Sequence, residues 1–336
     1  MLLRSLHPLV LAAALASTPA SADSGLSFHT DENLGVDVKV PALYPEGIEH
    51  DPTTGAFLLG SIRKGQVVRV HDDGRAEVLV EDERLRSVVG IRVDPERGRL
   101  LVNNADYGAS ERSTPADRFA TAALAIYDLE TGAPLQYVDL SALRADEQRF
   151  VNDLTIDKDG NAFVTDSLAA AIYRVTPEGE ASVFLTDERF RGEGFNLNGI
   201  QAHENGYLLV AKKSDGSLFR VPLDAPETFT EVTLPQPLVG TDGLVLTAAD
   251  ELIAITNRAA GQAPNTVHRL VSQDGWSSAE IVESVATGDV YTTTGTLRDG
   301  RLFVSQGHLH TLDDALKDPN QPLRESFRIR EIGAKP

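Results

Sequence analysis

Residues 198–210 read NGIQAHENGYLLV, and this stretch decides the fold. Two short runs that suit β-strands flank an Asn-Gly pair, which is the strongest short-range signal for a tight hairpin turn. A second Asn-Gly pair, Asn198-Gly199, opens the first strand. The stretch therefore predicts a β-hairpin whose first residue carries an amide oxygen.

The same layout of strand, polar turn and more apolar strand recurs along the chain. A second hairpin usually follows, as in VVRVHDDGRAEVLV at residues 67–80 and IYRVTPEGEASVFL at residues 172–185. Four short strands per unit, repeated at intervals of roughly 40 to 60 residues, are typical of propeller blades. The sequence therefore predicts an all-β fold, a six-bladed β-propeller. The six units start at Glu46, Val89, Asn152, Asn198, Asp242 and Thr294.

Segments outside this pattern have their own predictions. We expect residues 103–122 to form a long loop in the second blade, and residues 112–124 and 309–316 to hold short helical turns. The last unit lacks a strand after residues 325–333, and VDVKV at residues 36–40 has no hairpin partner of its own. We therefore expect this N-terminal strand to complete the sixth blade, which closes the ring and removes its open edges.

The first 22 residues are expected to be a signal peptide. They combine a short basic start, an apolar run at residues 8–15 and the small-residue cleavage site Ala20-Ser21-Ala22. Residues 23–336 would then form a single propeller domain, located in the periplasm or secreted. No other apolar run approaches the ~20 residues that a membrane-spanning helix needs.

Composition narrows the possible chemistry. The chain has no cysteine, which excludes disulfides, thiol catalysis and thiolate metal sites. Its net charge of −19 argues against nucleic acid and anionic membranes as partners, because both attract basic surfaces. A small-molecule substrate is the expected partner, and the sequence leaves the oligomeric state open.

The innermost strand of each blade lines the central channel of a propeller, so the residues that open these strands should lie at one height. Four of the six carry an amide or carboxylate oxygen: Glu46, Asn152, Asn198 and Asp242. Two carboxylates and two amides suit the all-oxygen shell of Ca²⁺, whereas zinc or copper would favour histidine or thiolate ligands. Each residue alone is equally at home in an ordinary turn. Their common register is what predicts a Ca²⁺ site.

Loops that follow the second strand of each blade should form the rim of this site. They supply the candidate substrate-binding residues Arg63, Tyr107, Lys212 and Arg258, and the candidate acid or base His308. The basic residues can equally serve to soften an acidic surface, and His308 can equally be a hydrogen-bonded rim residue. His50 and His203 are expected on the opposite face, and His268 is expected to be structural.

Other catalytic motifs are absent from the sequence. It has no G-x-S-x-G elbow, no P-loop and no G-x-G-x-x-G. The glycine-containing segment RGEGFNLNG at residues 191–199 leads into a strand, so it does not suit phosphate binding.

The motifs PEGIEHD, NDLTIDKDGNAFVTDS, LNGI and DGL, each opening a blade, resemble the regucalcin/gluconolactonase family of six-bladed propellers. The segments NGYLLVAKKSDGSLFRV and SFRIREI resemble a branch of it called calcium-dependent phosphotriesterase-like. The order Glu, Asn, Asn, Asp is also similar to the calcium shell of diisopropyl fluorophosphatase and, more distantly, of the paraoxonases. His50 stands where the family has a tryptophan, and the histidine pair of the paraoxonases has no match.

The resemblance implies a catalytic Ca²⁺ held by Glu46, Asn152, Asn198 and Asp242, with Asp242 doubling as base or nucleophile. Family activities are hydrolysis of lactones and organophosphate esters, and strictosidine synthase is a related propeller with another reaction. The expected function is thus an exported calcium-dependent hydrolase of a lactone or ester, with Asp242 and His308 as catalytic residues. The alternative is a non-catalytic periplasmic propeller that binds a ligand or protein around a structural calcium.

Overall fold

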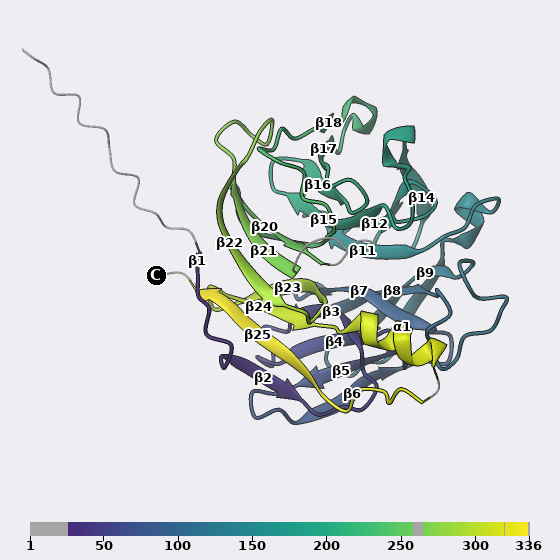
Figure 1. Ribbon diagram of the computed structural model, residues 1–336. Coiled ribbons are helices and arrows are strands. Elements are labelled where there is room, and N and C mark those ends of the chain that lie inside the picture. The colour runs from purple at the N-terminus through teal and green to yellow at the C-terminus, as the bar shows by residue number, and fades with distance from the viewer. Residues whose placement is uncertain (1–25, 258–264, 319, 335–336) are drawn as a thin grey trace, which may run out of the picture.

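A computed structural model of the chain describes residues 26–257, 265–318 and 320–334, and the statements below concern these residues. Their strands form six separate antiparallel sheets arranged around a centre, as Figure 1 shows. The prediction of an all-β six-bladed β-propeller is confirmed. The signal peptide predicted at residues 1–22 and the candidate Arg258 lie outside the described residues.

The first three blades follow the chain in order. The first comprises β3 (Pro45–His50), β4 (Phe57–Ser61), β5 (Gln66–Val70) and β6 (Ala76–Glu81). The second comprises β7 (Ser87–Asp94), β8 (Arg99–Ala105), β9 (Ala122–Asp128) and β10 (Pro134–Asp139), and the third β11 (Val151–Ile156), β12 (Ala162–Asp166), β13 (Ala171–Val175) and β14 (Ala181–Thr186).

The next two blades repeat this order. The fourth comprises β15 (Leu197–His203), β16 (Tyr207–Lys212), β17 (Leu218–Pro222) and β18 (Thr230–Glu231). The fifth comprises β19 (Thr241–Ala248), β20 (Glu251–Thr256), β21 (Asn265–Val271) and β22 (Glu280–Gly288). Short 3₁₀ turns lie in the connections at Ser141–Arg144, Glu188–Phe190 and Pro226–Thr228.

The sixth sheet draws on both ends of the described chain. It contains β23 (Thr292–Arg298), β24 (Arg301–Gln306) and β25 (Phe327–Ala334), and two N-terminal strands pair with β25: β1 (Ser27–Phe28) and β2 (Gly35–Val38). In Figure 1 the purple β2 lies along the yellow β25. On the inner side, Thr293 Oγ1 donates a hydrogen bond to the Glu46 carbonyl at 2.6 Å, which joins the sixth blade to the first.

The apolar content of each strand matches its position in the blade, as the first blade shows. The second strand β4, with the sequence FLLGS, is buried at all five positions, whereas the outermost strand β6, with the sequence AEVLVE, is mostly exposed. A strand covered by neighbouring blades on both faces must be apolar throughout, and an edge strand tolerates polar residues. Apolar side chains between adjacent blades form the core, and no helix among the described residues is long and apolar enough to cross a membrane.

Each innermost strand carries a register irregularity near its channel end. Residues in a β-bulge leave the regular ladder, and this re-aims their side chains. All four residues predicted as metal ligands fall within these irregularities. The shifts lie between Pro45 and Ile48, Val88 and Ile91, Val151 and Leu154, Leu197 and Ile200, Thr241 and Gly243, and Thr292 and Gly295.

The two segments predicted to be helical differ in how much helix they form. Residues 309–316 lie in α1 (Leu309–Lys317), which confirms that prediction. Residues 112–124 form no helix, but they contain one helical turn, in which Thr121 N–H donates to the Asp117 carbonyl at 3.0 Å before the chain enters β9. Thr114 N–H donates to the Asp117 carboxylate at 2.9 Å, which caps the start of this turn.

Candidate functional site

A cavity of about 180 Å³ lies at the centre of the ring, where the innermost strands begin. All four predicted metal ligands line it, so the prediction that they share one height of the channel agrees with their positions. The other lining residues come from β7, from loops and from α1. The lining comprises Glu46, Ile62, Val89, Tyr107, Phe150, Asn152, Phe195, Asn198, Lys213, Asp242, Tyr291, Leu309 and Asp313.

The carboxylate of Asp242 is the centre of a hydrogen-bonded cluster on the cavity floor. Lys213 Nζ lies 3.0 Å from Asp242 Oδ1 and donates to Asn257 Oδ1 at 2.6 Å. The amide nitrogens of Asn198 and Asn257 also donate to Asp242, one to each carboxylate oxygen. Asp242 therefore accepts from one ammonium and two amide groups, and a carboxylate can accept about one more donor.

Burial and charge set the ionisation of this floor. Burial by itself lowers the pKa of Lys213, but the interactions with Asp242, Tyr291 and Glu46 together outweigh it, and the pKa is raised. The ammonium is thus charged at neutral pH. Burial raises the pKa of Glu46 well above its usual range, and the negative charges of Asp242 and Asp153 add to this rise.

One side of the floor holds unpaired amide oxygens. Asn152 Nδ2 donates to Ser167 Oγ at 3.0 Å, whereas Asn152 Oδ1 is buried without a hydrogen-bond partner. Asn103 Nδ2 donates to the Asn152 carbonyl at 3.1 Å, and its own Oδ1 is likewise unpaired. A buried acceptor without a donor is costly, so Asn152 Oδ1 marks the place where a ligand can bind, whereas Asn103 lies behind it and does not line the cavity.

The walls above the floor are aromatic. The rings of Phe150 and Phe195 meet edge to face with centroids 5.0 Å apart, and Tyr107 lies 6.1 Å from Phe150. Burial, with the carboxylate of Asp313 on α1, raises the pKa of the Tyr107 hydroxyl, which keeps it protonated. The cavity therefore offers apolar walls and a charged floor, as small-molecule sites do.

The candidate rim residues occupy different places. Tyr107 lines the cavity, and Arg63, Lys212 and His308 are not among the residues that line it. Arg63 Nη1 donates to the Ala109 carbonyl at 2.8 Å and supports the loop of the second blade. Lys212 Nζ donates to the Arg189 carbonyl at 2.9 Å and pairs with Asp215 Oδ2 at 2.7 Å.

His308 lies directly before α1, in the left-handed backbone region with φ of 51°. Its ring neighbours Phe327 and His310, at centroid distances of 6.4 and 6.1 Å. Burial and the nearby Arg324 lower the pKa of His308 to about 4, so it is neutral at pH 7. A neutral histidine outside the cavity is poorly placed to donate a proton there.

The other histidines lie in strands or at strand ends. His203 Nε2 lies 2.6 Å from the Ala249 carbonyl, and its ring stacks on Tyr207. His268 Nδ1 contacts Ser284 Oγ at 2.8 Å, in the outer part of the fifth blade. These two and His50 are not among the residues that line the cavity.

The predicted calcium shell can be compared with this arrangement. Asn152 Oδ1 is free to bind a cation, but Asp242 already accepts three N–H donors, and Asn198 turns its amide nitrogen toward it. The Lys213 ammonium stands against the carboxylate that a Ca²⁺ ion would need. As arranged, the four oxygen residues therefore do not fit an open Ca²⁺ shell.

Sequence reasoning missed several residues of the floor and walls, chiefly Lys213, Asn257 and Tyr291. A repeated signal exists for the first two. In five blades, the residue that directly follows the second strand donates its N–H to a backbone carbonyl just before the innermost strand. Lys213, for example, donates to the carbonyl of Asn196. This hydrogen bond holds the residue at the channel end of its blade. These residues are Ile62, Ser167, Lys213, Asn257 and Gly307.

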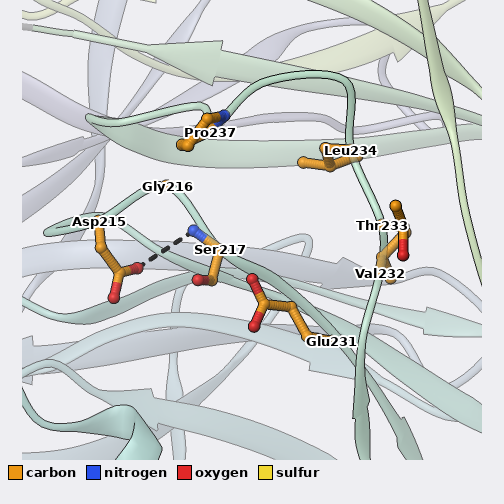
Figure 2. Close-up of a pocket in the computed structure, with 8 residues that line it drawn as sticks. All are labelled: Asp215, Gly216, Ser217, Glu231, Val232, Thr233, Leu234 and Pro237. Atoms are coloured by element: carbon orange, nitrogen blue, oxygen red, sulfur yellow. Dashed lines mark hydrogen bonds between the residues drawn. The ribbon is translucent and has the colours of Figure 1, made fainter.

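A second hollow, of about 360 Å³, lies at the outer part of the fourth blade, beside β18 (Figure 2). Its lining includes Asp215 and Glu231, and Ser217 N donates to Asp215 Oδ1 at 3.2 Å. None of the predicted site residues lines it. The channel cavity is therefore the candidate functional site.

No protein-family model matches the chain, and no curated protein matches its sequence. Solved structures do resemble it. The Malassezia sympodialis allergen Mala s 1 matches with a TM-score of 0.69 and 19% identity, over 88% of this chain and 95% of the allergen. The calcium-binding protein regucalcin from Agrobacterium tumefaciens matches with a TM-score of 0.59 and 19% identity, over 90% and 96%.

A gluconolactonase from Xanthomonas campestris matches with a TM-score of 0.58 and 15% identity, over 94% of this chain and 93% of the enzyme. The TM-scores establish that the fold is shared. Because the sequence identities are low, the chemistry of this protein has to be inferred from the residues of its own channel. The chain is thus a six-bladed β-propeller with the same overall fold as regucalcin and gluconolactonase.

Proposed function

We propose that the channel is the active site of an enzyme that hydrolyses a small lactone or ester, with organophosphate esters as a further substrate class to test. The observation that carries the proposal is the buried cluster of Asp242, Lys213 and Asn257 at the bottom of an aromatic-walled cavity. The fold likeness to a gluconolactonase supports the same substrate class. Paired charges in a dry cleft are a common feature of catalytic sites.

The roles follow from the chemistry of the groups. The carboxylate of Asp242 takes a proton from water as the water oxygen attacks the carbonyl carbon, and the carbonyl oxygen becomes an oxyanion. Lys213 and the amide of Asn198 are N–H donors that stabilise this oxyanion. The carbon–oxygen bond of the ester then breaks, and the leaving alkoxide receives the proton. Tyr107 and Phe150 supply the apolar surface against which the substrate binds.

Calcium, the cofactor expected from the sequence, does not fit the hydrogen bonding of the channel floor described above. Regucalcin, a calcium-binding protein, shares the fold. The ligands of a Ca²⁺ ion in this chain would be Glu46, Asn152, Asn198 and Asp242. The mechanism above does not use the ion, because Lys213 supplies the positive charge at that place.

The test is a panel of lactones, aryl esters and phosphotriesters, assayed with and without chelator. Asp242→Asn should lower kcat/KM by about 10²-fold or more with an unchanged circular dichroism spectrum. Asp215→Asn, at the outer hollow, is the matched control and should leave turnover unchanged. Full activity of Asp242→Asn would refute the role of this residue.

The competing function is a non-catalytic propeller that binds a ligand or protein. Saturable binding of a panel compound to the wild-type protein without turnover would favour it over hydrolysis. We also propose that the protein is exported to the periplasm or secreted, because its first 22 residues have the composition of a signal peptide.

A further inference from the structure

The positive charge on the channel floor comes from the protein itself. Lys213 directly follows β16, and its side chain is 10% exposed. Three groups hold its ammonium: Asp242 Oδ1 at 3.0 Å, Asn257 Oδ1 at 2.6 Å, and the ring of Tyr291, whose centroid is 5.6 Å away. A buried lysine with these partners is a fixed part of the site rather than a mobile surface chain.

The protein itself neutralises the central carboxylate of the floor without a metal. The Lys213 ammonium neutralises the Asp242 carboxylate, and Glu46 is the remaining acidic residue that lines the floor. A Ca²⁺ ion would add two positive charges beside an ammonium that is already present. With an effective dielectric constant of about 20, a unit positive charge about 4 Å from the ammonium would weaken binding roughly 10³-fold, and the double charge of Ca²⁺ doubles this repulsion energy.

The hydrogen bonds favour the lysine as well. The amide nitrogens of Asn198 and Asn257 both point at Asp242, and Asn257 Nδ2 also donates to the Thr292 carbonyl at 3.0 Å. For Asp242 and Asn198 to bind Ca²⁺, Lys213 would have to withdraw and the Asn198 amide would have to turn its oxygen inward. Each change breaks a buried hydrogen bond.

We propose that Lys213 is the resident cation of this channel, taking the place that the sequence predicted for Ca²⁺, so that the wild-type protein does not bind Ca²⁺ tightly. The inference concerns the site of the proposed function. Its test reads metal binding rather than turnover, so the two can fail separately. Metal-insensitive protein without any hydrolysis would refute only the proposed function.

The experiment uses the full protein and Ca²⁺ alone as the probe. Calorimetric titration and thermal melting are recorded in chelator and in CaCl₂. The wild-type protein should bind Ca²⁺ with a Kd weaker than about 1 mM, the weak end of protein calcium sites, and its Tm should not respond to about 1 mM CaCl₂. Lys213→Met should melt lower in chelator, recover with CaCl₂, and bind Ca²⁺ at least about 10²-fold more tightly than wild type.

Lys212→Met is the matched control, since it removes the same charge one residue away, where Lys212 pairs with Asp215 outside the cavity. Its response to CaCl₂ should equal that of wild type. Wild-type binding with micromolar Kd, or an equal Ca²⁺ affinity in wild type and Lys213→Met, would overturn the inference. If Lys213→Met does not fold, the wild-type titration alone decides.

Discussion

The strand β2 offers a direct test of how the ring holds together. It pairs with β25 over four residues, in the register Gly35 to Arg330 through Val38 to Phe327. Val38 is fully buried in the core, and Val36 is 6% exposed. If β2 belongs to the cooperative fold, then Val38→Ala should destabilise the whole propeller.

The magnitude follows from the atoms removed. Val38→Ala deletes two buried methyl groups, each worth about 0.8 kcal/mol in transfer from water. The cavity left behind adds to this, and the expected loss in free energy of unfolding is about 2–3 kcal/mol. Domains are typically stable by about 5–15 kcal/mol, so this loss is easy to measure.

Denaturant unfolding followed by tryptophan fluorescence is the assay. Trp276 is the only tryptophan in the sequence, is 1% exposed, and lies between β21 and β22 of the fifth blade, so it reports on a part of the ring away from β2. The matched control is Val78→Ala on the outer strand β6, where the side chain is 51% exposed and the expected change is below about 0.5 kcal/mol. Equal effects of the two substitutions on the Trp276 transition would refute the reasoning.

Two further predictions concern acid stability and export. Burial lowers the pKa of His268 to about 4 in the folded protein, below about 6.5 in the unfolded chain, so its stabilising contribution is complete above about pH 6.5 and is lost as the pH falls toward 4. Between pH 6.5 and about 4, the free energy of unfolding of His268→Gln, measured by denaturant unfolding, should therefore fall less than that of wild type. An equal fall in the two proteins would contradict the lowered pKa of His268. For export, mass spectrometry of the protein from the periplasm or medium should show a chain beginning at Asp23, and a mature chain that retains Met1 would contradict it.

The sequence predicted the fold well because the fold repeats. Short strands separated by turn dipeptides recur six times, and their spacing alone indicates blades. The same repeat brought out Glu46, Asn152, Asn198 and Asp242, because residues at one register of a closed ring must converge. The helical turn expected at residues 112–124 is limited to one i→i+4 hydrogen bond, from Thr121 N–H to the Asp117 carbonyl, because β9 begins at Ala122.

The lysine on the floor was harder to predict. Lys212 and Lys213 are adjacent and have the same side chain. Only their position relative to the end of β16 determines which of the two reaches the channel. Lys212 is the last paired residue of β16, opposite Leu197, and its ammonium reaches Asp215, whereas the next residue turns into the channel. Side chains in a regular strand alternate between its two faces, and a bulge shifts this alternation. The direction of a side chain at a strand end therefore cannot be predicted by counting residues in the sequence.

The recurring bulges have a consequence for how this protein can change over evolutionary time. A residue within a bulge has few ladder constraints, so replacing its side chain leaves the pairing of the blade almost intact. The ring thus has one equivalent position per blade around its axis, and these positions hold side chains as different as Glu46, Val89 and Asn152. A substitution at one of these positions can therefore change the chemistry of the channel while the fold stays the same.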